Sequence, residues 1–187
     1  MTFLRRLLRR FGQDESATIM AEAVLVLPFM LWSYLGLFVY WDSFRVMNKV
    51  QKASYTISDM ISREMVTIND AYITGMDTLM ESLIDRDQNV SLRVSSVTWS
   101  QLRNRFEIHW SRSTDATGLP PLTTTTLQLL KDSIPDMSDG DYVVIVETRV
   151  GYEPAFDVGM DAQTLAQFIV TRPRFVPKVC LSGVTCS

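Results

Sequence analysis

Residue types that perform catalysis are scarce in this chain of 187 residues. It contains one histidine and two cysteines, and it lacks the HExxH, GxSxG, P-loop and glycine-rich dinucleotide-binding motifs. The histidine, His109, stands beside Glu107 on the polar side of an alternating segment, where a solvated or hydrogen-bonded imidazole is expected. We therefore expect no catalytic residue, no cofactor and no enzymatic activity, with an enzyme acting after export as the least favoured alternative.

Four aspartates in the segment KDSIPDMSDGDY raise the question of calcium binding. They are Asp132, Asp136, Asp139 and Asp141. An EF-hand loop needs the DxDxDG order of ligands and a closing glutamate, and this segment has neither. We expect a solvated loop that precedes a strand, and no metal site.

A carboxylate at the edge of an apolar segment is a stronger indication of function. From Ala23 to Trp41 the chain carries no charge, and this length suffices to cross most of a hydrocarbon layer about 30 Å thick. Glu22 precedes the segment directly, and an uncompensated carboxylate inside a bilayer costs about 3 kcal/mol. Such a residue marks a function or a partner, unless its carboxylate lies among the lipid headgroups at the cytoplasmic interface.

The charges on either side of this segment predict its orientation. Four arginines and no acid lie in the first twelve residues (Arg5, Arg6, Arg9 and Arg10), whereas Asp42 opens the following segment. The basic side faces the cytoplasm, so we expect an N-in, C-out single-pass membrane protein. A cleaved secretory signal peptide is the competing interpretation, but the apolar run is long and no small-x-small site follows it.

The two cysteines, Cys180 and Cys186, enclose the short sequence LSGVT near the C-terminus. In an exported domain oxidation is expected, and Gly183 supplies a turn that lets a small loop close. A disulfide is the favoured interpretation, because a metal pair would need further ligands and His109 is distant in sequence. We expect the bond to tether the C-terminal tail and to contribute about 2 kcal/mol.

Helical periodicity continues beyond the apolar segment. Apolar residues at spacings of three and four predict one long helix from about Ala17 to Thr67, with Pro28 as a kink point and Ser54 as the one interruption of the stripe; they are Met47, Val50, Ile57, Ile61, Met65 and Ile68. Asn69 and Asp70 offer capping oxygens to a second helix that ends before the DRDQN segment.

The period then changes to two, which predicts strands. We expect them at residues 90–99, 106–110, 142–150 and 167–171, with a short helix at 123–131 and a turn at Pro154. In the second of these, Phe106, Ile108 and Trp110 are predicted to share one face. The predicted class is α+β, with an antiparallel sheet packed on the amphipathic half of the long helix. The predicted parts are a basic cytoplasmic leader (1–17), a transmembrane helix (18–41) and a periplasmic domain (42–187).

The N-terminal pattern resembles a known family. A short basic leader, the small residues Ser16, Ala17 and Thr18, then Glu22 and the run AVLVLP ending at Pro28 are similar to the N-terminus of TadE-like minor pilins of tight-adherence (Flp) pilus systems. The onward segment from Phe38 to Glu64 also resembles that family. The similarity covers about the first 65 residues and implies a pilin-like fold and a role in pilus assembly or priming.

The resemblance also implies site residues and partners. A prepilin peptidase would cut between Ala17 and Thr18, which makes Glu22 the fifth residue of the mature chain and places it near the new α-amino group. The family usually has glycine before the cut, where this chain has Ala17; a cut after Gly12 would put Ala17 at the fifth position. The implied partners are other pilins or pseudopilins, the inner-membrane assembly machinery, the peptidase and membrane lipid.

Without residues 1–17 the chain keeps 14 of its 18 basic and 19 of its 21 acidic side chains, so we expect no nucleic-acid partner. The alternative to the pilin function is a signal-anchored periplasmic sensing or scaffolding domain whose leader is never removed.

Overall fold

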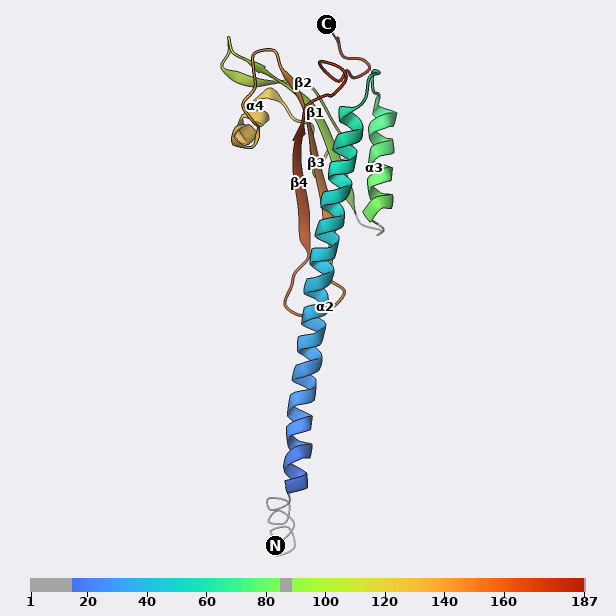
Figure 1. The fold of residues 1–187 in the computed structure, drawn as a ribbon, viewed down its shortest axis with the longest axis vertical. Helices are drawn as coiled ribbons and strands as arrows, with labels where there is room; N and C mark the ends of the chain where they lie inside the picture. Colours follow the sequence, from blue (N-terminus) through green and yellow to red (C-terminus); the bar gives the residue numbers. More distant parts are fainter. Residues whose placement is uncertain (1–14, 85–88, 187) are drawn as a thin grey trace, which may run out of the picture. The chain divides into compact units, whose positions relative to one another are not determined.

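The protein, described by a computed structural model over residues 15–84 and 89–186, has an α+β fold, as the sequence predicts (Figure 1). The predicted basic leader comprises residues 1–17, of which 1–14 lie outside the described residues. The elements in chain order are α2 (Glu15–Ser62), α3 (Asp70–Ile84), β1 (Val90–Ser100), β2 (Arg105–Ser113), α4 (Thr124–Leu127), the 3-10 helix η1 (Gln128–Ser133), β3 (Tyr142–Tyr152) and β4 (Gln163–Thr171).

The chain forms two compact units. The first comprises the residues up to Ser43 together with Pro154–Asp161, and the second comprises Phe44–Glu153 and Ala162–Ser187. The first unit therefore contains the apolar part of α2 and the loop between β3 and β4. The second contains the sheet, α3, α4, η1 and the C-terminal segment.

Helix α2 is a single element of 48 residues, and it ends five residues earlier than predicted. After Ser62 the backbone tightens, because the amides of Arg63 and Glu64 bond to carbonyls only three residues back. Ile68 then pairs with Leu181 in an isolated parallel bridge. This long-range pairing draws the chain out of the helix, which the apolar spacing alone did not reveal.

Within the second unit, the buried face of α2 differs from the predicted stripe because two of the predicted methionines are exposed and serines are buried. Val46, Val50, Ile57 and Ile61 are buried, but Met47 is 45% exposed and Met65, beyond the helix, is 70% exposed. Serines complete the buried face where a break was predicted. The Ser54 hydroxyl lies 2.8 Å from the carbonyl oxygen of Val50 and 2.8 Å from the hydroxyl of Thr148 in β3. A paired serine satisfies its polar group and allows the helix to approach the strand closely.

Helix α3 follows the predicted signals. The side chain of Asn69 accepts a hydrogen bond from the backbone amide of Tyr72 at 2.8 Å, which satisfies one free donor at the start of the helix. Ile73, Met80 and Ile84 are its buried residues. The guanidinium of Arg112 in β2 donates to the carboxylate of Asp70 at 3.1 Å, so α3 lies against the sheet at β2 as well as at β1.

The sheet has four antiparallel strands in the order β2-β1-β3-β4. Alternate residues of its two central strands point to opposite faces. One face carries Leu92, Val94, Val144, Val146 and Thr148, and it packs against α2 through the Ser54–Thr148 contact. The other face carries Val97, Val143 and Ile145, which join Phe106, Leu122, Leu127 and Ile134 in one hydrophobic cluster. Both faces of the central strands are thus covered.

A β-bulge in β2 overturns one sequence prediction. Ser96 pairs with Trp110, but the next residue of β1, Val97, pairs with Ile108, which leaves His109 as an extra residue. Since the side-chain period is two, the extra residue places Trp110 on the opposite face from Phe106 and Ile108. The strict alternation predicted for the three apolar residues is therefore wrong. The bulge turns the Trp110 indole toward the C-terminal segment.

Candidate functional site: the apolar half of helix α2

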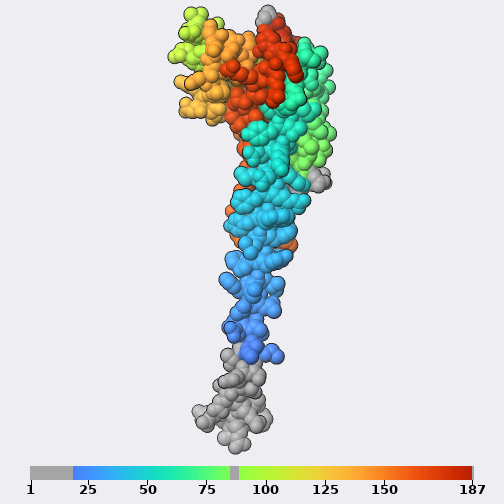
Figure 2. All heavy atoms as spheres, in the orientation of Figure 1, coloured from blue at the N-terminus to red at the C-terminus, as the bar shows by residue number. Residues whose placement is uncertain are grey.

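The N-terminal half of α2 displays apolar side chains on most of its surface. Most large apolar side chains from Ile19 to Phe38 are exposed, with exposed fractions of 41–74%. Examples are Val24, Leu27, Phe29 and Trp32. Figure 2 shows this segment in blue. An 18-residue window has a mean hydropathy of 1.9, and only 6% of it is buried. A core helix of similar composition is mostly buried, so by length and composition this segment can span a membrane.

The residues that resemble the prepilin pattern lie in the first turns of the helix. Ala17 and Thr18, the predicted cleavage position, are helical, and Glu22 follows Thr18 by about one turn. The Glu22 side chain is exposed, and no salt bridge to another described residue is found for it. Pro28 lies inside the unbroken helix. The helix thus presents a carboxylate at the edge of its apolar surface, one turn from the predicted new N-terminus.

The outer end of the apolar segment has a neighbour that the sequence did not indicate. Val39 and Asp42 are buried, although residues just before them are exposed. Phe156, in the loop between β3 and β4, packs edge-on against Phe38, with 6.1 Å between ring centroids. The predicted turn at Pro154 is present, since β3 ends at Tyr152. The contact with α2 has no sequence signal, because the two phenylalanines are far apart in the chain.

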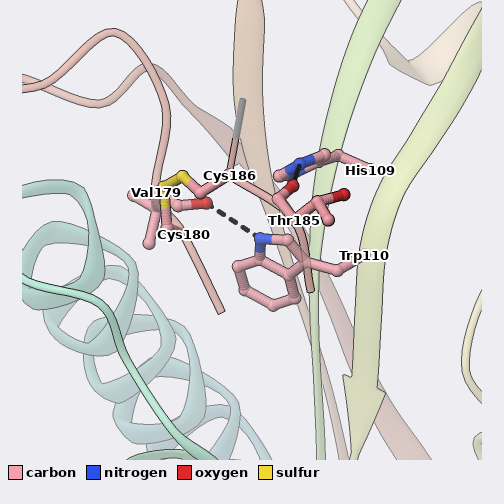
Figure 3. The surroundings of a disulfide bond; sticks show 6 residues. All are labelled: His109, Trp110, Val179, Cys180, Thr185 and Cys186. Atoms are coloured by element: carbon pink, nitrogen blue, oxygen red, sulfur yellow. Dashed lines mark hydrogen bonds between the residues drawn. A yellow bond between two sulfur atoms is a disulfide. The ribbon is translucent and has the colours of Figure 1, made fainter. Parts of the chain in front are cut away.

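The C-terminal cysteines form the predicted disulfide, whose Cα atoms lie 5.8 Å apart (Figure 3). Gly183 in the enclosed loop has φ of +83°, a backbone conformation that glycine adopts without strain. The segment does more than form a tethered tail. Val179 and Leu181 are almost completely buried, and the Val179 carbonyl accepts a hydrogen bond from the Trp110 indole at 2.8 Å. The backbone of Ile68 also bonds to Cys180 and Ser182 on either side of Leu181.

His109 contacts residues of the second unit that have no catalytic arrangement with it. Its Nε2 donates to the carbonyl of Thr185 at 3.1 Å, as Figure 3 shows, and its ring lies edge-on to that of Tyr142. No hydroxyl, thiol or carboxylate nucleophile is hydrogen-bonded to it within the described ranges. The imidazole therefore connects the residue before Cys186 to β2 through a hydrogen bond.

Two aspartates of the predicted aspartate-rich loop are bonded to residues distant in sequence. Asp139 accepts a hydrogen bond from the backbone amide of Gln101 at 2.7 Å, and Asp141 lies 3.3 Å from the guanidinium of Arg172. Over residues 15–84 and 89–186, no group of three or more His, Cys, Asp or Glu side chains is arranged to hold a metal ion. These carboxylates order the turns around the sheet.

Two open clefts in the second unit lack groups arranged for catalysis. One of about 590 Å³ is lined by Trp99, Phe106 and Ile134 together with Lys131, Asp132, Pro135, Asp136 and Met137. Another of about 410 Å³ lies where β3 and β4 end, beside Tyr152 and Gln163. The described residues that line them include no histidine, cysteine or serine. The apolar surface of α2 is therefore the feature that most directly indicates a function.

Searches against models of protein families, curated protein sequences and solved structures gave no match to this chain.

Proposed function

We propose that this protein is a TadE-like minor pilin or pseudopilin that acts in the assembly or priming of a tight-adherence pilus. The main support for this proposal is that the two halves of α2 have different surroundings. Its N-terminal half is apolar and exposed, whereas its C-terminal half buries Val50, Ile57 and Ile61 against a four-stranded antiparallel sheet. One helix thereby serves as membrane anchor and as core element of an exported domain. No step of this function requires catalysis by the protein itself.

The anchor sits in the bacterial inner membrane before assembly and among neighbouring helices afterwards. The outer half of α2 supports such packing, because large apolar side chains remain exposed beside its buried face. Phe44 is 64% exposed and Tyr55 is 56% exposed, with Met47 between them. A second subunit's helix would cover apolar area there without disturbing the buried face. Partners are other pilins or pseudopilins and the assembly machinery in the membrane.

Glu22 supplies register in this proposal. Cleavage between Ala17 and Thr18 by a prepilin peptidase creates an α-amino group that is about 6 Å along the axis from Glu22. In a helix bundle of low dielectric an unpaired carboxylate is costly, so the axial offset that pairs it with an amine, in the same or a neighbouring subunit, is favoured. The exposed position of Glu22, without a salt bridge to another described residue, leaves its carboxylate available for that pairing.

The test replaces Glu22 with alanine and counts pili on cells that express the variant at the normal level. We expect normal membrane insertion and at least about a tenfold loss of piliation, as if the pairing contributed about 1.4 kcal/mol to the single step that incorporates this subunit. Met20→Ala is the matched control, since Met20 is also exposed, at 73%, and lies on the same helical segment. Normal piliation by the Glu22→Ala variant would refute the register mechanism.

An unprocessed, signal-anchored periplasmic sensing or scaffolding domain is the second candidate. Ala17 favours it, because the prepilin pattern has glycine at the position before the cut. The two candidates differ in the mass of the mature chain. In cells with an active prepilin peptidase, a protein that begins at Thr18 supports the pilin function, and a protein that keeps residues 1–17 supports the scaffolding domain.

A further inference from the structure

The loop between β3 and β4 shares a compact unit with the apolar half of α2. This loop, Pro154–Asp161, belongs to the same unit as the residues up to Ser43. The rings of Phe38 and Phe156 meet edge-on at 6.1 Å within that unit. In Figure 1 the loop runs beside the helix. A hairpin connection is therefore held against the segment that can span a membrane.

The place of Phe38 along α2 sets the depth of the loop. The uncharged run ends at Trp41, three residues after Phe38. At about 1.5 Å per residue, Phe38 lies only about 5 Å inside the outer end of the run. A side chain in contact with Phe38 is then close to the boundary between hydrocarbon and headgroups at the outer end of the run. Aromatic residues are enriched at this boundary.

The composition of the loop fits that boundary. Phe156, Val158 and Met160 alternate with Asp157, Gly159 and Asp161. Phe156 remains 45% exposed even with Phe38 beside it, so part of its ring is uncovered in the described structure. The loop contains no lysine or arginine, which excludes attraction to anionic lipid as its mode of attachment. Burial of apolar side chains is the remaining contribution.

We propose that the loop 154–161 inserts its apolar side chains into the outer interfacial layer of the membrane that α2 crosses. This inference rests on the membrane anchorage included in the proposed function. Phe156 enters the layer between headgroups and acyl chains, and the carboxylates of Asp157 and Asp161 stay in water. A second point of attachment, distant in sequence from the helix, limits the rotation and the axial displacement of the anchored helix in the bilayer.

The experiment measures the depth of a fluorescent label in vesicles. The full chain, with its native disulfide oxidised, is reconstituted into phosphatidylcholine vesicles, and a single introduced thiol at Ala155→Cys is labelled with an environment-sensitive fluorophore. Ala155 is exposed and precedes Phe156, so the label reports on the loop without replacing its apolar residues. Lipids that carry a quencher either near the headgroup or deep in the acyl chain then give the depth.

Two further positions serve as controls. Met30→Cys lies within the apolar segment, and Leu102→Cys lies in the turn between β1 and β2, where Leu102 is 94% exposed. We expect the label at 155 to be quenched by the shallow quencher at least about twofold more than by the deep one. The label at 30 should respond most to the deep quencher, and the label at 102 should respond to neither.

The outcomes separate this inference from the proposed function. Deep quenching at 30 with equal, weak quenching at 155 and 102 would show an anchored helix whose loop stays in water, and would overturn the inference alone. No quenching at 30 would overturn the anchor and the inference together. Quenching at 155 that disappears when protein is diluted in lipid would assign the loop to a contact with a second copy, and would also overturn the inference.

A variant tests the role of the aromatic ring. Phe156→Ser in the Ala155→Cys background should reduce shallow quenching at least about twofold, and the matched Phe175→Ser change should leave it unchanged. Phe175 is 64% exposed and lies outside the loop. Unchanged quenching with Phe156→Ser would overturn the role of apolar insertion.

Discussion

A bidentate ion pair joins the two central strands on the sheet face that carries Val97 and Ile145. Arg93 and Glu147 are direct cross-strand neighbours, and both guanidinium-to-carboxylate distances are 2.6 Å. A third donor of Arg93 bonds to the Pro120 carbonyl. The two side chains are only 8% and 12% exposed. Their alternation with apolar residues could not be distinguished in the sequence from a solvated polar face, so the pair was not predicted.

Loss of one partner should therefore be far more costly than loss of both. Glu147→Leu leaves a buried guanidinium without its carboxylate, and we expect it to lower the free energy of unfolding by about 3–5 kcal/mol. The double change Arg93→Met with Glu147→Leu should recover at least half of that loss. Urea unfolding of the four proteins in the double-mutant cycle measures this coupling. Additive effects of the two changes would mean that the pair does not act as a unit.

Two aspartates should affect stability in opposite directions. Burial raises the pKa of Asp77, against a smaller lowering by the Thr114 hydroxyl, whereas the backbone amides of Gly118 and Thr117 lower the pKa of Asp115. A raised carboxyl pKa means that the charged form is disfavoured by folding, so Asp77 destabilises the protein above its folded pKa. A lowered pKa means that Asp115 stabilises the protein above its unfolded pKa, and that this stabilisation is lost as pH falls through the folded pKa.

We expect Asp77→Asn to raise the Tm at pH 7 and Asp115→Asn to lower it. Both differences from the parent protein should shrink as the pH falls through the carboxyl range toward about 3, below the unfolded pKa of about 3.9. Thermal unfolding followed by circular dichroism between pH 3 and 7 checks the signs. Changes of the same sign for both variants would contradict the assigned causes of the two pKa shifts.

At the scale of the elements, most of the fold followed from periodicity and capping signals. The four strands, α3 and the short helix near Thr124 appear where period and caps placed them. The sequence predictions were wrong where a long-range contact competes with the local sequence pattern. Pairing of Ile68 with Leu181 ends the helical path, and the bulge at His109 reverses the facing of Trp110. Neither Phe38 nor Phe156 has a local signal for the contact between them, because it is set by the tertiary fold.

The serines of α2 offer a test of its packing on the sheet. Ser54 and Ser58 are buried on the helix, while Thr56 between them is exposed. Ser58 is only 2% exposed, so we expect a larger side chain at this position to displace its neighbours, and overpacking costs about 1–3 kcal/mol. We expect Ser58→Leu to lower the free energy of unfolding by that amount and Thr56→Leu to change it by less than about 0.5 kcal/mol. Chemical denaturation measures both, and equal effects would mean that the serine face is not closely packed.

At the scale of the whole molecule, charge pattern and disulfide lead to one expected topology. The basic leader predicts a cytoplasmic N-terminus, and the Cys180–Cys186 bond fits an oxidising compartment on the other side of the membrane. The disulfide also closes a segment whose Val179 carbonyl bonds to Trp110. The sequence predicted the bond itself from spacing and a glycine turn. Burial of the flanking residues in the core was not predicted, since five residues between two cysteines show no period.

Redox labelling in intact cells therefore tests the orientation of the chain. If the sheet unit is periplasmic, both cysteines should resist alkylation in unreduced wild-type cells and should react fully after reduction, because exported thiols with a partner six residues away are oxidised. The double Cys→Ser variant should keep its fold and lose at most about 2 kcal/mol of stability, because the loop is short and the bonds of Ile68 and Trp110 still hold the segment.

Introduced single thiols provide the orientation control, with Leu102→Cys reacting with a membrane-impermeant reagent from outside the inner membrane. Quantitative labelling of Cys180 and Cys186 without reduction would refute the disulfide in cells, and protection of Leu102→Cys from the impermeant reagent would refute the N-in, C-out orientation.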